Sequence, residues 1–594
     1  MHHLAQHQAA ETLEQFLGDP ADPQNLCSFK RSVELDEREE YPEESCRTLE
    51  DWGFYDYFIP TAQGGKFKCY EELLALSKVL ARRDLTVAIA LGQVYLGAVH
   101  VWVSGTDEQK RRVAELISDK RQMAFALSER AHGSDILASD VRASVNAAGG
   151  YLLAGEKWLI NNGTRARALT VFARTSADGG PRGFSLFLVE KDRLAESSYT
   201  HLPKVKTVGI RGADISGIRF NESELPPESL IGALGAGLEN ALTGLMITRT
   251  LCAAFSLGAA DTALRATLDF ALSRRLYNDT VFAIPNARNE LVEAFIDLLT
   301  CDCVAVAAVR GLHAAAEQSS LCSAVVKYFV PTTIEDAIHS LSVVLGARGY
   351  LREEHRWGIF QKMARDNAVV SLFDGSTAVN LHAITLQLKH LTSRRAKTEV
   401  HELEQISSRR SMIFSLDKPL AEFDPKRLAI SGRGQDDVLR GLELSLPALY
   451  ELKTEPEVDS GVLETIISLT EEMIEELIAH DRVIEELGQR PGYRSGKAPE
   501  LFKLAKNYCV FHAAAACVQM WLYNRRLLGG FGGKGEWLAL CLDRLRRRFH
   551  PNRSLGRPSY VANVAEEMVR LYREGQLFSV APFRLAAQQK DISG

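Results

Sequence analysis

The stretch Met123-Ala-Phe-Ala-Leu-Ser-Glu-Arg-Ala-His-Gly-Ser-Asp135 marks the point where the sequence changes from a helical to an extended pattern. An apolar run precedes Ser128, and a polar loop closes on Gly133 and Ser134. Such a strand and loop present hydroxyls and free backbone N–H groups, which can hydrogen-bond a planar heteroaromatic edge or a phosphate. A strand followed by an ordinary polar loop is the alternative interpretation.

Helical periodicity flanks this extended region on both sides. The segment from Tyr70 to Ala81 places its leucines near one helical face, and Ala/Leu-rich helical segments return from Gly237 to about Leu391. Short strands separated by turn residues lie between them. We therefore predict an α+β, mostly α fold with four domains. They are an N-terminal helical domain (1–122), a middle β-barrel-like domain (123–232), a C-terminal four-helix bundle (233–392) and an additional helical domain (396–594).

Composition restricts the class of protein. The net charge of −6 and the pI near 6.2 argue against a nucleic-acid binder. The ten cysteines form neither CxxC pairs nor a disulfide framework, so we expect a cytoplasmic protein, and we predict no metal site. The N-terminus lacks a signal-peptide pattern. The apolar stretch from Val510 to Tyr523 is too short to cross a bilayer, so we expect no transmembrane segment.

One carboxylate stands out in the stretch Val369-Val-Ser-Leu-Phe-Asp374-Gly-Ser-Thr-Ala-Val-Asn380. Apolar neighbours raise the pKa of a carboxylate, which can then take a weakly acidic proton at neutral pH. Gly375 lets the backbone approach a ligand closely. Asp-Gly-Ser is also ordinary turn chemistry, so this stretch alone leaves a structural turn open.

Several segments, taken in order, resemble the acyl-CoA dehydrogenase superfamily over roughly residues 35–390. They are Phe125-Ala-Leu-Ser-Glu with Gly133-Ser134-Asp135, Gly155-Glu-Lys-Trp-Leu-Ile-Asn-Asn-Gly163, Phe270-Ala-Leu-Ser-Arg-Arg-Leu-Tyr277, Leu345-Gly-Ala-Arg-Gly-Tyr350, Arg365-Asp366 and Asp374-Gly375. The resemblance implies a helical domain, a β domain and a second helical domain around bound FAD.

The resemblance also implies which residues hold the cofactor. Two strands would contact the flavin, Ser134 would meet the cofactor or the thioester arm of the substrate, and Ser376 would contact the cofactor. Arg274 and Leu276 would reach the FAD phosphates, often from a neighbouring subunit, and Gly346 would meet the adenosine. A guanidinium suits a pyrophosphate because its fork matches the oxygens. The residues of the two flavin strands are Phe125, Leu127 and Ser128 on the first and Leu159, Ile160 and Asn161 on the second.

Asp374 corresponds to the base that removes the substrate α-proton in many members of this family. Gly375 corresponds to a residue near the thioester carbonyl, and Arg249 to a position beside the base, so both are candidate substrate-binding residues. Some relatives place the base just before this arginine, but that position is Thr248 here. The implied reaction is α-proton abstraction with β-hydride transfer to flavin N5, giving an α,β-enoyl thioester.

The match departs from the family pattern at three places. Asp374 replaces the usual glutamate, the tryptophan of the second flavin strand comes one position early as Trp158, and Val343 stands where glutamine is usual. Because nitroalkane oxidases of this superfamily also use aspartate, a flavin oxidase is an alternative function. A non-catalytic binding or scaffold paralogue is another.

Residues beyond about 396 resemble the helical extension of very-long-chain acyl-CoA dehydrogenases, which implies a homodimer. The expected partners are an acyl-CoA or acyl carrier protein, with electron-transfer flavoprotein or oxygen as electron acceptor. The basic segment from Arg544 to Arg553 could attract an anionic partner. Alternatively, it is a solvated helix face paired with nearby glutamates.

Overall fold

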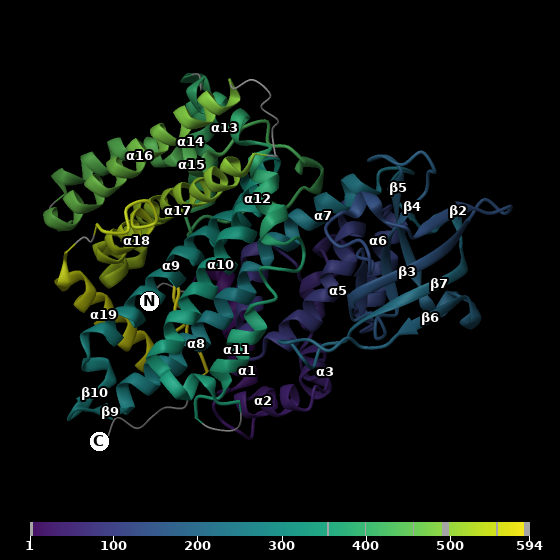
Figure 1. Ribbon diagram of the computed structural model, residues 1–594, viewed down its shortest axis with the longest axis horizontal. Helices are drawn as coiled ribbons and strands as arrows, with labels where there is room; N and C mark the ends of the chain where they lie inside the picture. The colour runs from purple at the N-terminus through teal and green to yellow at the C-terminus, as the bar shows by residue number, and fades with distance from the viewer. Residues whose placement is uncertain are drawn as a thin grey trace.

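The computed structural model describes residues 4–352, 356–397, 400–455, 457–489, 498–553 and 556–586. A β domain lies at one end of a larger helical body (Figure 1). The N-terminal helical domain, the middle β domain and the C-terminal helical region confirm the predicted fold class.

The helices before the β domain are α1 (Gln8–Leu17), α2 (Phe29–Glu37), α3 (Glu43–Trp52), α4 (Tyr70–Ala81), α5 (Leu85–Ser104) and α6 (Asp107–Ser118). The strands of the β domain are β1 (Met123–Ala126), β2 (Arg142–Val145), β3 (Tyr151–Asn161), β4 (Ala168–Arg174), β5 (Phe184–Glu190), β6 (Tyr199–Leu202), β7 (Ile215–Leu225) and β8 (Leu230–Ile231).

The helical body continues with α7 (Gly237–Leu251), α8 (Ala253–Ser273), the hairpin β9 (Arg275–Leu276) and β10 (Asp279–Thr280), α9 (Pro285–Ala314), α10 (Ser319–Leu345), α11 (Ile359–Asn367), α12 (Thr377–Thr385) and α13 (Leu388–Ala396). The C-terminal region holds α14 (Val400–Phe414), α15 (Asp437–Glu451), α16 (Ser460–Gly488), α17 (Pro499–Lys534), α18 (Glu536–Arg546) and α19 (Pro558–Arg573).

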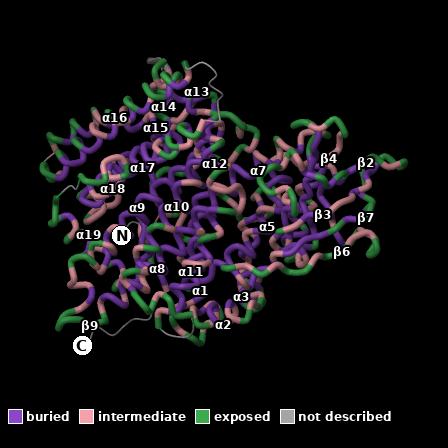
Figure 2. Tube along the Cα trace, viewed as in Figure 1, coloured by how far each residue is buried: buried purple, intermediate pink, exposed green. Residues whose placement is uncertain are grey.

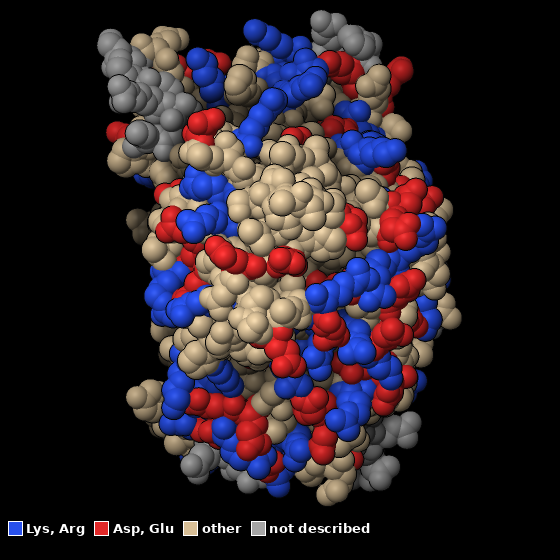
Figure 3. Space-filling model, turned by 90° about the vertical axis from the view of Figure 1, so that its right-hand side faces the viewer, with Lys and Arg blue, Asp and Glu red and all other residues tan. Residues whose placement is uncertain are grey.

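The β domain is an eight-stranded sheet with its own apolar core. Its order is β6-β7-β3-β2-β4-β5-β8, and β1 pairs in parallel with β4 off this path. Alternating side chains of β3 and β7 place Leu153 and Ile218 inside the domain, where they meet Val171 and Phe187. The face of the molecule that lies at the right of Figure 1 carries interspersed acidic and basic side chains (Figure 3).

Helix α5 joins the β domain to the helical body. The amide of Asn162 donates a 2.9 Å hydrogen bond to the carbonyl of Ala90, and the hydroxyl of Thr170 donates a 2.7 Å bond to the carbonyl of Gly97. A Cβ atom on Gly97 would lie 2.7 Å from the backbone nitrogen of Ala124. Glycine therefore lets α5 pack directly against β1, and most of this helix is buried (Figure 2).

Two stretches are long and apolar enough by composition to cross a membrane, Leu85–Ser104 and Gly237–Ser273. Their most apolar windows are 83% and 78% buried inside the protein, as in the core helices of a globular protein. The first of them is α5.

The C-terminal region shares one hydrophobic core with the rest of the helical body. Helix α17 packs on α9 and α12. The guanidinium of Arg310 on α9 donates a 2.8 Å hydrogen bond to the carbonyl of Ile413, and Ser579 donates a 2.6 Å bond to Asp302. The chain after α19 thus returns to α9, and this region is built into the fold.

Acidic side chains neutralise the basic segment that begins at Arg544. Arg544 binds Glu293 at 2.6 Å and Asp297 at 2.9 Å, and Arg547 binds Glu293 at 2.8 Å. His550 contacts Glu476 at 2.8 Å. These ion pairs favour the interpretation of this segment as a paired helix face.

Candidate active site

Asp374 lies in the turn between α11 and α12, and α7 holds this turn in place. The backbone of Asp374 has φ 55°, and that of Gly375 has φ 91°. A Cβ atom on Gly375 would lie 2.7 Å from a guanidinium nitrogen of Arg249, whose Nε donates a 2.8 Å hydrogen bond to the Asp374 carbonyl. Only glycine combines this backbone conformation with such a close contact. Arg249 therefore positions the main chain of the turn.

The two carboxylate oxygens of Asp374 have different surroundings. Oδ2 accepts a 2.8 Å hydrogen bond from the hydroxyl of Thr248 and lies 3.7 Å from the Sγ of Cys252. Oδ1 is buried and has no hydrogen-bond partner among the described residues. One oxygen is thus anchored, and the other is available to receive a proton.

Opposing effects set the pKa of Asp374. Burial raises the pKa above its usual range, and the cations of Arg249 and Lys327 act in the opposite direction. Lys327 is itself buried, which lowers its pKa, and its Nζ hydrogen-bonds the carbonyl of Val370. Its Nζ also lies 5.0 Å from the ring centroid of Phe373. The site therefore holds a carboxylate of raised pKa beside the buried Lys327 and the half-buried Arg249.

A narrow apolar cavity of about 50 Å³ contains Asp374 in its lining. At about 30 Å³ for each water in the liquid, this is space for about two water molecules. Helices α4, α5, α7 and α8 and the segment Phe54–Phe58 supply most of the walls. The apolar lining includes Phe54, Phe58, Leu73, Leu80, Leu96 and Phe255. Such a cavity suits an apolar or weakly polar group beside a base.

Reciprocal hydrogen bonds connect the two predicted flavin strands. The backbone N–H of Trp158 donates to the carbonyl of Ser128 at 3.0 Å, and the Ser128 hydroxyl donates to the carbonyl of Trp158 at 2.8 Å. The neighbouring residues form a buried ion pair, in which Lys157 Nζ lies 2.8 Å from a carboxylate oxygen of Glu129. This pair lies directly beside Ser128 and fixes the separation of the strands.

The surroundings of these strands fit a flat, partly polar ring such as that of FAD. Leu159 occupies an irregularity in the pairing of β3 with β7, has φ 58° and is 45% exposed. The side-chain oxygen of Asn161 is buried without a hydrogen-bond partner in the described structure, so it can accept one from a ligand. Phe125 and Ile160 are buried, Leu127 is half-buried, and Ser134 is exposed. The exposed Leu159 and the unpaired side-chain oxygen of Asn161 therefore fit a position beside such a ring.

A second group of predicted cofactor residues lies elsewhere. Arg274 caps α8, and Leu276 is in the exposed hairpin β9–β10, which Figure 1 shows at the end of the molecule away from the β domain. Gly346 follows α10 and is exposed. Ser376 precedes α12 beside Asp374. A single chain therefore does not bring Arg274 and Leu276 to the flavin strands.

Lys327 and Cys252 are neighbours of Asp374 that were not predicted from the sequence. A lysine in an apolar helix was a usable signal for Lys327, because a buried cation needs a polar or acidic partner. No comparable signal existed for Cys252, a single buried cysteine.

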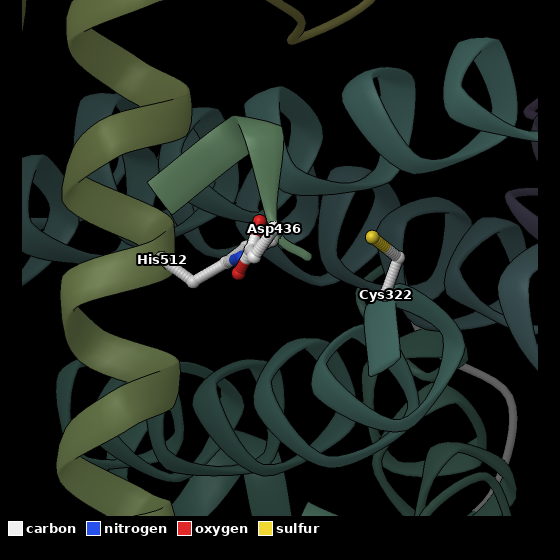
Figure 4. A group of neighbouring side chains, drawn as sticks. All are labelled: Cys322, Asp436 and His512. Carbon is white, nitrogen blue, oxygen red and sulfur yellow. The ribbon is translucent and has the colours of Figure 1, made fainter. Parts of the chain in front are cut away.

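A further cluster joins Cys322, Asp436 and His512, whose side chains come from three separate elements (Figure 4). Asp436 caps α15 and accepts hydrogen bonds from the backbone N–H of Leu439 at 3.0 Å and from the hydroxyl of Tyr508 at 2.6 Å. The Nδ1 atom of His512 lies 3.0 Å from the same carboxylate. These contacts already use both carboxylate oxygens, so the cluster fixes α15 against α17.

Family models match three parts of the chain. They describe the acyl-CoA dehydrogenase N-terminal domain (residues 6–119), middle domain (124–223) and C-terminal domain (235–389). A probable acyl-CoA dehydrogenase, fadE25 of Mycobacterium leprae, is 25% identical over 59% of this chain and 88% of its own length.

Two solved structures share the fold. Butyryl-CoA dehydrogenase from Megasphaera elsdenii has a TM-score of 0.59 and 21% identity, over 64% of this chain and 98% of that one. The prolyl acyl carrier protein oxidase AnaB has a TM-score of 0.57 and 19% identity, over 64% of this chain and 97% of that one.

Proposed function

Because this chain belongs to the acyl-CoA dehydrogenase family, whose members are oxidoreductases that act on CH–CH groups, we propose that it dehydrogenates an acyl thioester with Asp374 as base. The product is the α,β-enoyl thioester. The observation that supports this proposal best is the carboxylate of Asp374, buried at an apolar cavity with one oxygen free of hydrogen bonds.

The residues around Asp374 have different roles in proton removal. Oδ1 takes the proton from the α-carbon, while the Thr248 hydroxyl holds Oδ2 and fixes the orientation of the carboxylate. Arg249 holds the Asp374 main chain, and Lys327 adds a positive charge that favours the ionised base. Bound FAD would supply the acceptor for the hydride that leaves the β-carbon.

A homodimer is part of the proposal. The support for it is the separation between Arg274 and the flavin strands within one chain, since a second copy could supply the missing phosphate contacts. The acyl carrier is CoA or a carrier protein, and the electron acceptor is electron-transfer flavoprotein or oxygen. All ten cysteines are free thiols, which supports a cytoplasmic location.

The test is anaerobic mixing of the FAD-loaded protein with acyl-CoA and acyl-carrier thioesters while flavin absorbance is followed. We expect a thioester to bleach the flavin and the enoyl product to appear. Bleaching by nitroalkanes alone would instead establish the oxidase alternative. Failure to bind FAD after gentle purification and supplementation would establish the scaffold alternative.

A further inference from the structure

The cavity at Asp374 carries polar groups that an acyl chain made only of hydrocarbon would leave unsatisfied. Gln93 on α5 lines this cavity and is 7% exposed, and its side-chain amide has no hydrogen-bond partner among the described residues. Ser77 on α4 lines the same cavity, and its hydroxyl is likewise without a partner in the described part of the chain. Two neighbouring helices thus present unpaired donors and acceptors to one small space.

These unpaired groups differ from the other polar side chain on α5 in this lining. The hydroxyl of Tyr95 lies 2.9 Å from that of Tyr70, so both phenols are paired within the protein. Leaving a buried donor or acceptor without a hydrogen-bond partner is unfavourable. Gln93 and the half-buried Ser77 can therefore both bond a polar group that enters the cavity.

The size of the cavity limits that partner. The cavity itself, at about 50 Å³, accommodates a compact group. Aromatic side chains close its walls, with the ring centroids of Phe54 and Phe58 5.4 Å apart and those of Phe58 and Tyr95 5.5 Å apart. Dense aromatic packing of this kind makes the walls hard to displace.

We infer that this enzyme acts on compact acyl thioesters whose acyl group carries a hydrogen-bonding substituent, such as a hydroxyl or keto oxygen, and that Gln93 and Ser77 recognise this substituent. The inference rests on the proposed dehydrogenation at Asp374. The primary amide of Gln93 can donate to and accept from the substituent, and the Ser77 hydroxyl can do the same. A site built to hydrogen-bond a substrate oxygen rejects the analogue that lacks it far more strongly than an apolar pocket rejects an extra methylene.

The test compares two acyl groups of nearly equal size, which differ only in a hydroxyl group in place of a methyl group. The FAD-loaded protein is mixed anaerobically with 4-hydroxypentanoyl-CoA, in which a hydroxyl replaces one methyl group of 4-methylpentanoyl-CoA, and with that methyl compound itself. We expect the hydroxyl compound to reduce the flavin with a second-order rate constant at least about 10²-fold higher. Equal rates, or a faster methyl compound, would overturn the inference and leave the proposed function intact.

Two variants assign the preference to these side chains. Gln93→Leu should lower the rate with the hydroxyl compound by at least about 30-fold without lowering that with the methyl compound. Ser77→Ala should act in the same direction, whereas Ser104→Ala, on α5 but outside the cavity lining, should not. If Gln93→Leu fails to fold, Ser77→Ala alone decides. If Gln93→Leu and Ser77→Ala bind FAD and still prefer the hydroxyl compound over the methyl compound, the inference would be overturned. Failure of every thioester would overturn the proposed function, and this inference with it.

Discussion

The hydroxyl of Thr248 donates a 2.8 Å hydrogen bond to Oδ2 of Asp374, although 126 residues separate them in the sequence. In some relatives the base lies at the position of Thr248. In this protein Asp374 supplies the carboxylate, and Thr248 supplies a hydroxyl that holds it. Because only Oδ2 is held, Oδ1 remains free to act on a substrate.

Replacing the base should abolish flavin reduction. Asp374→Asn keeps the size of the side chain but removes its basicity, so we expect the rate constant to fall by at least about 10³-fold. FAD content should stay that of the unmodified protein, because Asp374 lies outside the flavin strands. Rapid-mixing absorbance with an active thioester measures both quantities. Undiminished reduction by this variant would exclude Asp374 as the base.

The Thr248 hydrogen bond should affect the pH profile of the reaction. It stabilises the ionised carboxylate, so Thr248→Val should raise the pKa of Asp374. The base acts when deprotonated, and kcat/KM rises with pH through this pKa. We therefore expect the rising limb to move to higher pH. Thr250→Val is the matched control, since the Thr250 hydroxyl bonds a backbone carbonyl of its own helix. Equal shifts in both variants would contradict this prediction.

The positive charge of Lys327 should also set the position of the rising limb in the pH profile of kcat/KM. Its cation lowers the pKa of Asp374 against the larger effect of burial. Lys327→Met removes the charge while keeping much of the side-chain volume, so the limb should again move to higher pH. At pH values well above the pKa of Asp374, the rate should approach that of the unmodified enzyme. A lower rate with an unchanged pH midpoint would instead indicate that Lys327 only supports the local structure.

The buried pair of Lys157 and Glu129 should govern cofactor retention. Removing one partner leaves the other charge buried and unpaired, which costs about 3–5 kcal/mol. Lys157→Met should therefore release FAD from the two strands and lower the melting temperature, as measured by flavin fluorescence and calorimetry. Arg219→Met, which loses only an exposed ion pair with Glu156, is the control and should retain FAD. Full retention of FAD by the Lys157 variant would contradict this role.

The proposed two-chain cofactor site predicts complementation. Arg274→Ala and Asp374→Asn should each be inactive as homodimers. In a mixed dimer, one site combines an intact base from one chain with Arg274 from the other. Random exchange of subunits should therefore restore about a quarter of the activity. Activity no greater than that of the separate variants would show that each chain builds its site alone.

The sequence by itself determined the fold class and predicted Asp374 as the base. The apolar periodicity around Tyr70–Ala81 and the strands of residues 123–232 report which faces are buried, and burial is what forms helices and sheets. The order of short motifs around Asp374 was enough to suggest the family. Local patterns of this kind depend on residues that are close in the sequence, so they can be recognised without the structure.

Only the tertiary structure decided what surrounds the base. Thr248, Cys252 and Lys327 reach Asp374 because α7, α8 and α10 pack together, and no pattern in consecutive residues encodes that contact. The unpaired Gln93 is likewise visible only once two helices and an aromatic segment enclose it. Burial and hydrogen-bond satisfaction are properties of the packed chain, so the chemistry of the site follows from the packing.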